Sequence, residues 1–249
     1  MDKKILVNEI FGPTIQGEGA LIGKPTIFVR TGSCDYRCHW CDTLYAVLPE
    51  YRHEWTPMTA EAILEEVARL SAGHPILITI SGGNPALQPL EPLLDIGHQC
   101  GFTFALETQG SVARSWFAKL DHLVLSPKPP SSAMSTDWEK LAACVAAAGS
   151  QTHTVLKIVV FDEEDYAYAR RVGAALPHLP IYLQIGNPTP LQSVQGTADE
   201  TFFSSQQPNL CAMEQHLSWL LDRVTADGWN EVTVLPQLHV LLWGNKRGV

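Results

Sequence analysis

Nearly continuous apolar runs alternate with helical patterns along most of this chain of 249 residues. Runs of this kind, such as residues 76–81, are typical of strands that are covered on both faces of a sheet. Alternating strands and helices imply a parallel sheet with right-handed crossover connections. About six such repeats are fewer than the eight of a closed barrel. The sequence therefore predicts an α/β fold, an open, partial β/α barrel that forms a single domain over residues 1–249.

The boundaries of the predicted elements follow from the apolar runs and from capping residues. A strand-like run covers residues 5–10, and the other predicted strands span 26–31, 76–81, 102–108, 122–126, 155–161, 181–185 and 231–235. Helices are predicted to begin after Thr59 and at Asp162, whose side chains can accept a backbone hydrogen bond at a helix N-terminus. Further helices are predicted over 90–100, 137–148 and 210–226. The polar stretch 188–208 is predicted as a long loop that could act as a lid.

The composition is that of an ordered globular protein, with 45% hydrophobic and 17% charged residues. The net charge is −9, from 17 basic and 26 acidic residues. This balance argues against nucleic acid as the main partner, because such binding rests on neutralising phosphates. No stretch reaches the apolar length of a membrane span, and the first residues lack the features of a signal peptide. We therefore expect a cytoplasmic protein, in which thiols stay reduced.

Three cysteines, Cys34, Cys38 and Cys41, lie close together in the spacing C-x3-C-x2-C. In a reducing compartment such a group indicates metal or redox chemistry rather than disulfides. Cysteine thiolates are the usual ligands of iron–sulfur clusters. Three thiolates would leave one iron of a four-iron cluster without a protein ligand, and an open metal position is where chemistry can take place.

A zinc site is the competing interpretation of these cysteines. It would need a fourth ligand, for which His39, Asp42 and His53 are the nearby candidates. Structural zinc sites usually pair two short ligand spacings, and no second pair is present, so the cluster is the favoured interpretation. Of the other cysteines, Cys100 and Cys144 lie in apolar helical patterns and are predicted to be small buried side chains.

Small and polar residues follow the carboxyl ends of several predicted strands, which is where parallel α/β sheets bind ligands. Each group alone is ordinary turn chemistry. Together with the cysteines after strand 26–31 they indicate one ligand site at that edge of the sheet. The groups are Gly82-Gly83-Asn84-Pro85, Glu107-Thr108-Gln109-Gly110, Ser126-Pro127-Lys128, and Gln184 with Gly186-Asn187-Pro188.

The cysteine spacing, with Trp40 before the last cysteine, resembles the radical S-adenosylmethionine (SAM) superfamily. The resemblance implies a radical SAM core in which three thiolates hold a 4Fe-4S cluster and SAM chelates the unique iron. Reductive cleavage of SAM would give a 5′-deoxyadenosyl radical that abstracts a substrate hydrogen. Gly82-Gly83 resembles the glycine motif that contacts the methionine end of SAM. Asn84 stands where many members have glutamate, and asparagine supplies no charge.

Nearly the whole chain resembles a narrower family, the 7-carboxy-7-deazaguanine synthases of queuosine (7-deazapurine) biosynthesis. In that family asparagine is a familiar variant in the glycine motif, and a trimmed barrel core fits the short chain. The matching segments are 11–19, 28–32, 41–43, 81–85, 107–110, 126–128, 237–239 and 243–244.

This second resemblance implies a reaction. The substrate would be 6-carboxy-5,6,7,8-tetrahydropterin, and hydrogen abstraction at C6 would start a radical ring contraction. Loss of ammonia would give 7-carboxy-7-deazaguanine, which makes the enzyme a carbon–nitrogen lyase that regenerates SAM. Mg2+ would assist, with Thr43 as its protein ligand. The resemblance also implies an electron donor such as flavodoxin and a homodimer.

The remaining site residues are assigned by the same resemblance, with some physical support. Arg30 has a planar fork that suits a carboxylate, although Glu107 could instead be its partner within the protein. Glu18 could pair with the guanidine-like edge of a pterin or be a solvated loop charge. The expected SAM contacts are Trp40, Asp42, Gly82, Gly83, Asn84, Ser126, Lys128, Gln184 and Asn187. The expected substrate contacts are Ile15, Gln16, Gly17, Glu18, Arg30, Ser81, Thr108, Gln109 and Val249, the last through its carboxylate.

Two other functions are compatible with the cysteine motif. A radical SAM activase, which makes a glycyl radical on a partner enzyme, would have a similar fold but needs an open groove for a peptide. The Gln16-Gly17-Glu18 loop and the terminal Trp243-Gly244 segment favour a closed site for a small molecule instead. An iron–sulfur electron carrier or a zinc-stabilised binding module is the non-enzymatic alternative. The three ligands and the barrel-sized chain argue against it.

Overall fold

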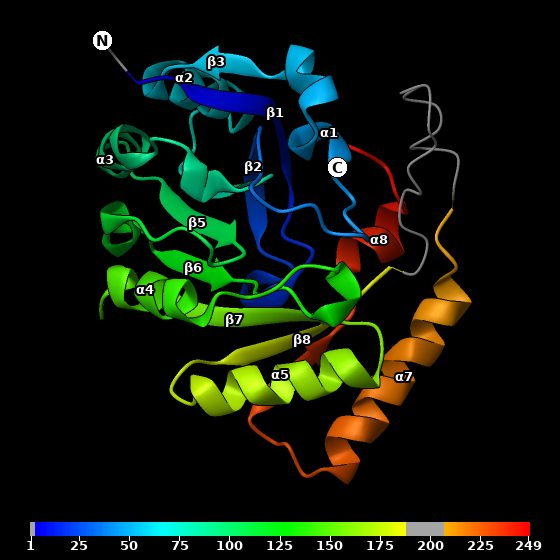
Figure 1. Cartoon of the computed structure of the whole chain (residues 1–249). Helices are drawn as coiled ribbons and strands as arrows, with labels where there is room; N and C mark the ends of the chain where they lie inside the picture. The colour runs from blue at the N-terminus through cyan, green and yellow to red at the C-terminus, as the bar shows by residue number, and fades with distance from the viewer. Residues whose placement is uncertain (1–2, 188–206) are drawn as a thin grey trace.

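The computed structural model describes residues 3–187 and 207–249, which form one sheet with helices around its outer face (Figure 1). The loop predicted over 188–208 lies outside the described residues except for its last two positions. The strand order is β3-β1-β2-β4-β5-β6-β7-β8-β9, and the sheet does not close on itself within the described ranges. The strands are β1 (Ile5–Ile15), β2 (Pro25–Thr31), β3 (Thr56–Met58), β4 (Leu77–Gly82), β5 (Thr103–Thr108), β6 (His122–Leu125), β7 (His153–Val160), β8 (Ile181–Ile185) and β9 (Val232–Leu235).

Most of the sheet is parallel, as the alternating pattern predicts. From β2 to β9, each strand pairs in parallel with its neighbour in the sheet. The fold is therefore the predicted open, partial β/α barrel. The other edge differs from the prediction, because β1 is antiparallel to β2 and β3 is antiparallel to β1.

Two features of the sequence conceal this antiparallel edge. The strand β1 continues to Ile15 rather than ending at residue 10, and it passes through Gly12-Pro13, a pair that resembles a turn. Its pairing with β2 shows two register shifts, and such irregularities bend a strand without ending it. The strand β3 is only three residues long and contains Pro57, which is tolerated on an edge strand.

The helices begin at residues that accept backbone hydrogen bonds, as predicted. Thr59 accepts from the N–H of Ala62 at 3.3 Å, and Asp162 accepts from the N–H of Asp165 at 2.9 Å. The helices are α1 (Leu44–Val47), α2 (Ala60–Leu70), α3 (Glu91–Gln99), α4 (Trp138–Ala148), α5 (Glu163–Ala175), α7 (Leu210–Ala226) and α8 (Leu238–Trp243). Figure 1 shows α2, α3, α4 and α5 succeeding one another around the outer face. Among the described helices, none has the length and apolar content needed to cross a membrane.

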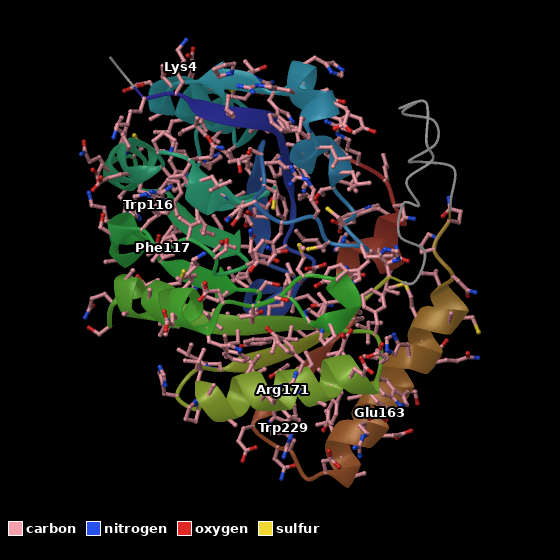
Figure 2. The ribbon with its side chains drawn as sticks, viewed as in Figure 1. Lys4, Trp116, Phe117, Glu163, Arg171 and Trp229 are labelled. Atoms are coloured by element: carbon pink, nitrogen blue, oxygen red, sulfur yellow. The ribbon has the colours of Figure 1, made fainter. Side chains whose placement is uncertain are left out.

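The core lies between the sheet and these outer helices. Trp116 and Phe117, in a short 3-10 helix beside α3 and α4, are 6% and 0% exposed, and their ring centroids lie 4.9 Å apart (Figure 2). Cys144 on α4 is buried, which confirms the prediction for it. The prediction for Cys100 is wrong, because this residue is exposed: it follows the last turn of α3 and so lies past the face that packs on the sheet.

Candidate active site

A cavity of about 290 Å3 opens at the carboxyl ends of the parallel strands. Most of the predicted site residues line it, although they come from widely separated segments. The predicted residues in its wall are Ile15, Gln16, Gly17, Glu18, Arg30, Cys34, Cys38, Trp40, Cys41, Asp42, Thr43, Ser81, Gly82, Gly83, Thr108, Gln109, Lys128, Asn187 and Val249. Asn84, Ser126 and Gln184 are not part of this wall, and each supports a residue or loop that is.

The cysteine loop, residues 32–43, follows β2 and packs closely on the Gly82-Gly83 turn. The N–H of Gly83 donates to the carbonyl of Thr31 at 3.0 Å, and the N–H of Asn84 donates to that of Ser33 at 2.8 Å. A Cβ atom on Gly83 would lie 2.0 Å from the Ser33 carbonyl oxygen, far inside contact distance. Glycine is therefore required here for the approach of the two backbones, in addition to any contact it makes with a ligand.

A second segment, residues 129–136, holds the cysteine loop from the other side. The backbone N–H of His39 donates to the carbonyl of Ser132 at 2.9 Å, and the indole N–H of Trp40 donates to Ser131 Oγ at 2.9 Å. The carboxylate of Asp165, 0% exposed, accepts from the N–H of Ser131 at 3.0 Å. Sequence reasoning missed this support, because no motif links Asp165 to the cysteines.

The three thiols are half-buried and line the same cavity. Burial raises the pKa of Cys34 and Cys38, and burial followed by the charge of Asp42 raises that of Cys41 to about 12. The thiolates therefore need a strongly positive group beside them, which an iron–sulfur cluster supplies. The described residues include no group of three or more His, Cys, Asp or Glu side chains placed to hold a single metal ion. Three thiols that line one cavity are a donor set that fits an iron–sulfur cluster.

Polar residues behind the cysteine loop bond to one another and to the loop. The buried Asn84 amide donates to Asp35 Oδ1 at 2.8 Å, and its oxygen accepts from Thr108 Oγ1 at 2.7 Å. Gln109 also donates to Asp35 Oδ1, at 2.6 Å, and lies 3.8 Å from Cys34 Sγ. These bonds fix the first half of the loop. They also explain how an uncharged asparagine is useful at position 84.

Lys128 and Trp40 form one side of the cavity near the cysteines. The ammonium of Lys128 lies 5.6 Å from the centroid of the Trp40 ring and donates to Ser126 Oγ at 3.1 Å. Ser126 therefore acts on the cavity through Lys128. Phe161 packs on Trp40 with ring centroids 5.5 Å apart, so the indole is held on several sides.

Another part of the cavity wall carries a set of ion pairs that we call the charged wall. Lys157 on β7 pairs with both Glu18 and Glu107, and its side chain is 4% exposed. Burial alone would raise the pKa of Glu18, but the charge of Lys157 and hydrogen bonds lower it to about 2. Glu18 is therefore a half-buried, ionised group paired within the protein rather than a solvated loop charge. The charged wall consists of five residues that line the cavity, Glu18, Arg30, Glu107, Lys157 and Arg247, and of Glu9, which is not among the lining residues but pairs with both arginines.

Arg30 is paired within the protein, but its partner is not Glu107. Its Nε donates to Glu9 Oε1 at 2.6 Å, and Glu107 is taken by Lys157. The prediction of a Glu107–Arg30 pair is wrong, because β1 lies antiparallel to β2 and places Glu9 opposite Arg30 in register. The second Glu9 oxygen accepts from Arg247 Nε at 3.1 Å. Among the described residues, the terminal nitrogens of Arg30 have no hydrogen-bond partner.

The loop before the first 3-10 helix is held by residues near the end of the chain. The N–H of Leu238 donates to the carbonyl of Gly17 at 2.9 Å, and a Cβ on Gly17 would lie 2.2 Å from His239 Nδ1. The buried Gln184 accepts from the N–H of Gly19 at 3.3 Å and donates to the Leu235 carbonyl at 3.2 Å. The loop that carries Gln16 and Glu18 is thereby fixed against the cavity.

No family model matches the chain. Two curated relatives, both named 7-carboxy-7-deazaguanine synthase, match it along its whole length. The relative from Bacillus cereus is 41% identical over 248 residues and the one from Bacillus subtilis 42% over 254 residues, and each match covers at least 99% of both chains. The chain belongs to the 7-carboxy-7-deazaguanine synthase family.

A solved structure has a fold similar to that of this member of the 7-carboxy-7-deazaguanine synthase family. The crystal structure of QueE from Escherichia coli superposes with a TM-score of 0.66 over 95% of each chain, at 21% identity. An identity this low bears on the fold alone. The shared fold is the open α/β sheet described above.

Several residues that build the site of this family member carry no sequence motif. Lys157 lies within a nearly continuous apolar strand, and a charged residue at such a position almost always has a partner, which is the one signal that could have revealed it. Glu9 and Arg247 lie 238 positions apart and gave no signal at all. Phe11 and Phe28, whose rings stack at 5.0 Å, complete an apolar part of the cavity.

Proposed function

We propose that this chain converts 6-carboxy-5,6,7,8-tetrahydropterin to 7-carboxy-7-deazaguanine with loss of ammonia. The observation that carries the proposal is a single cavity whose wall contains three cysteine thiols and a set of paired charged side chains. Membership of the 7-carboxy-7-deazaguanine synthase family supports the same reaction. The reaction makes the enzyme a carbon–nitrogen lyase of 7-deazapurine biosynthesis.

Family membership implies a 4Fe-4S cluster and SAM. Cys34, Cys38 and Cys41 would hold the cluster, which when bound supplies the electron that cleaves SAM to a radical. Trp40 and Lys128 line the same cavity as the thiols, are held by Ser131 and Ser126 respectively, and would contact SAM. Gly82 and Gly83 keep the cysteine loop close to β4 and leave their backbone open to the cavity.

The charged wall and the stacked phenylalanines suit a flat ring that carries a carboxylate. The free terminal nitrogens of Arg30 can receive a carboxylate in a bidentate geometry. Glu18 stays ionised at neutral pH because its pKa is about 2, so it can accept hydrogen bonds from ring N–H groups. Phe11 and Phe28 offer apolar contact beside Arg30, whose guanidinium carbon lies 5.4 Å from the centroid of the Phe11 ring.

Mg2+ binding at Thr43 is a further part of the proposal. Thr43 lines the cavity, and its hydroxyl lies 3.8 Å from Cys41 Sγ. A neutral hydroxyl binds Mg2+ weakly by itself, but Mg2+ keeps several waters and takes further ligands from its substrate. A substrate carboxylate bound at Arg30 could supply the missing negative charge.

The surroundings of the enzyme complete the proposal. We infer that it works in the cytoplasm, where its cysteines, all free thiols in the described residues, stay reduced. An electron donor such as flavodoxin would deliver the reducing electron. A homodimer is proposed from the resemblance, and the substrate is a small molecule rather than a nucleic acid.

One experiment tests the function. The protein is purified without oxygen, reconstituted with iron and sulfide, and supplied with SAM, reductant, Mg2+ and the carboxypterin. We expect 7-carboxy-7-deazaguanine, identified by mass spectrometry, and none from the Cys38→Ala variant. SAM cleavage with an unchanged pterin would refute the substrate and keep the superfamily. A protein that assembles no cluster would favour zinc.

A further inference from the structure

Lys157 is the most deeply buried charge in the cavity wall, and neither the motif nor the radical chemistry assigns it a task. We propose that Lys157 is a positioning residue, which holds Glu18 and Glu107 as a fixed pair of ionised acceptors for the N–H edge of the substrate ring. The inference rests on the proposed function and adds a specificity device to the same site.

The geometry places Lys157 between two carboxylates from different parts of the fold. Glu18 comes from the loop before the first 3-10 helix, Glu107 from β5, and Lys157 from β7. The Lys157 side chain is 4% exposed, whereas Glu18 and Glu107 are 15% and 27% exposed and line the cavity. Lys157 also lines the cavity, but it is the least exposed of the three and its ammonium is taken by both carboxylates, so it acts on a ligand mainly through them.

The charges of this trio do not balance. Two carboxylates and one ammonium leave a surplus of one negative charge beside the cavity. A ligand edge that donates hydrogen bonds would be stabilised there, and an edge of lone pairs would be repelled. The amino and N–H groups of a pterin ring are donors of this kind.

A neighbouring amide points to the same kind of ligand. Gln237 donates through Nε2 to Glu18 Oε1 at 2.6 Å, and its own oxygen is buried with no hydrogen-bond partner among the described residues. A buried acceptor without a donor is costly, so this oxygen is suited to a donor brought by the ligand. Gln237 lines the cavity and is 7% exposed.

Removal of the ammonium would change what the carboxylates can do. Two half-buried carboxylates without a counterion repel each other, so one of them would keep its proton to a higher pH. A protonated carboxyl is a donor and no longer matches a donor edge. The members of the trio, Glu18, Glu107 and Lys157, act on one another electrostatically. Outside the trio, His239 also acts electrostatically on Glu18.

The test uses the reconstituted holoenzyme with SAM and measures KM for the carboxypterin between pH 6 and 9. We expect Lys157→Met to raise KM about tenfold at pH 7, and this KM to fall as pH rises and the trapped proton leaves. The wild-type KM should lack this dependence, because Glu18 stays ionised over the range. SAM cleavage without pterin should stay within twofold of wild type.

Two further variants keep the test decisive. The double variant Lys157→Met with Glu107→Gln restores the single surplus negative charge. We expect its KM to be at least threefold lower than that of Lys157→Met and to lack the pH dependence, even where the single variant folds poorly. Lys119→Met is the matched control, because Lys119 bridges Glu91 and Asp95 at the surface, and its KM should be unchanged.

Three results would overturn the inference. They are an unchanged KM in Lys157→Met, a double variant with no recovery, and an equal loss of SAM cleavage, which would make Lys157 only structural. Failure of the proposed function is seen separately, because the wild-type protein would then cleave SAM and leave the pterin unchanged. That result would overturn the ligand named here as well.

Discussion

The cysteine loop and the charged wall both line one cavity, but they are assembled in different ways. The loop is a continuous segment, residues 32–43, and its backbone is fixed by the Gly82-Gly83 turn and by residues 129–136. The charged wall is built from side chains on separate strands and on the last residues of the chain, with pairs up to 238 positions apart. A local motif therefore specifies the first, whereas only the completed fold specifies the second.

The largest expected effect breaks the cysteine loop and leaves the charged wall intact. Cys38→Ala should abolish cluster assembly, because two thiolates cannot hold a cluster that needs three. Iron content and visible absorbance after reconstitution measure this. Cys211→Ala, which removes an exposed thiol outside the cavity, is the control. It should retain the iron content and the visible absorbance of the wild-type protein. Full iron content in Cys38→Ala would contradict the assignment of the ligands.

A smaller effect is expected where the loop meets β4. Gly83→Ala places a Cβ 2.0 Å from the Ser33 carbonyl oxygen, so we expect a loss of about 1–3 kcal/mol in the free energy of unfolding and faster loss of iron. Chemical denaturation and iron release under a chelator report the two effects. At Gly228 a Cβ meets nothing within 4 Å, so Gly228→Ala should change stability only through its positive φ and spare the cluster. Equal iron release in both variants would show that the close approach is unimportant.

The smallest of these effects is expected at Thr43, the last residue of the cysteine loop, where Mg2+ would join the loop to the substrate bound at the charged wall. Thr43→Ala should leave the iron content unchanged and raise the Mg2+ concentration for half-maximal product formation by about tenfold, the lower end of the usual cost of losing a metal-supporting group. A Mg2+ titration of the reconstituted enzyme measures this. An unchanged Mg2+ requirement would remove Thr43 from the metal site.

Much of the fold was predictable because its signals are local. Strand 181–185 and helix 210–226 were placed to the residue, since an apolar run or a capping side chain marks each boundary. The antiparallel edge was missed, because β1 passes through Gly12-Pro13 and β3 contains Pro57.

In the candidate site, too, residues with a local sequence signal were predicted and residues without one were missed. Cys34 was assigned from the cysteine spacing and Gly83 from the family resemblance, and the structure brings both to one cavity. Glu9 was not predicted as the partner of Arg30, because register between β1 and β2 decides it. Lys157 was passed over as part of an apolar run, although a lysine in a buried strand signals an ion pair. Long-range charge pairing thus escaped a reading of local patterns.

The most direct test of the account separates the tasks of the two regions in one protein. Arg30→Met removes the carboxylate-binding group from the charged wall and leaves the cysteine loop untouched. Loss of a charged hydrogen-bond partner costs about 2–3 kcal/mol, so product formation per enzyme should fall about 30- to 150-fold. Iron content and SAM cleavage without pterin should stay within twofold of wild type. A parallel loss of iron and SAM cleavage, or an unchanged rate of product formation, would contradict the division of the cavity into a cluster side and a substrate side.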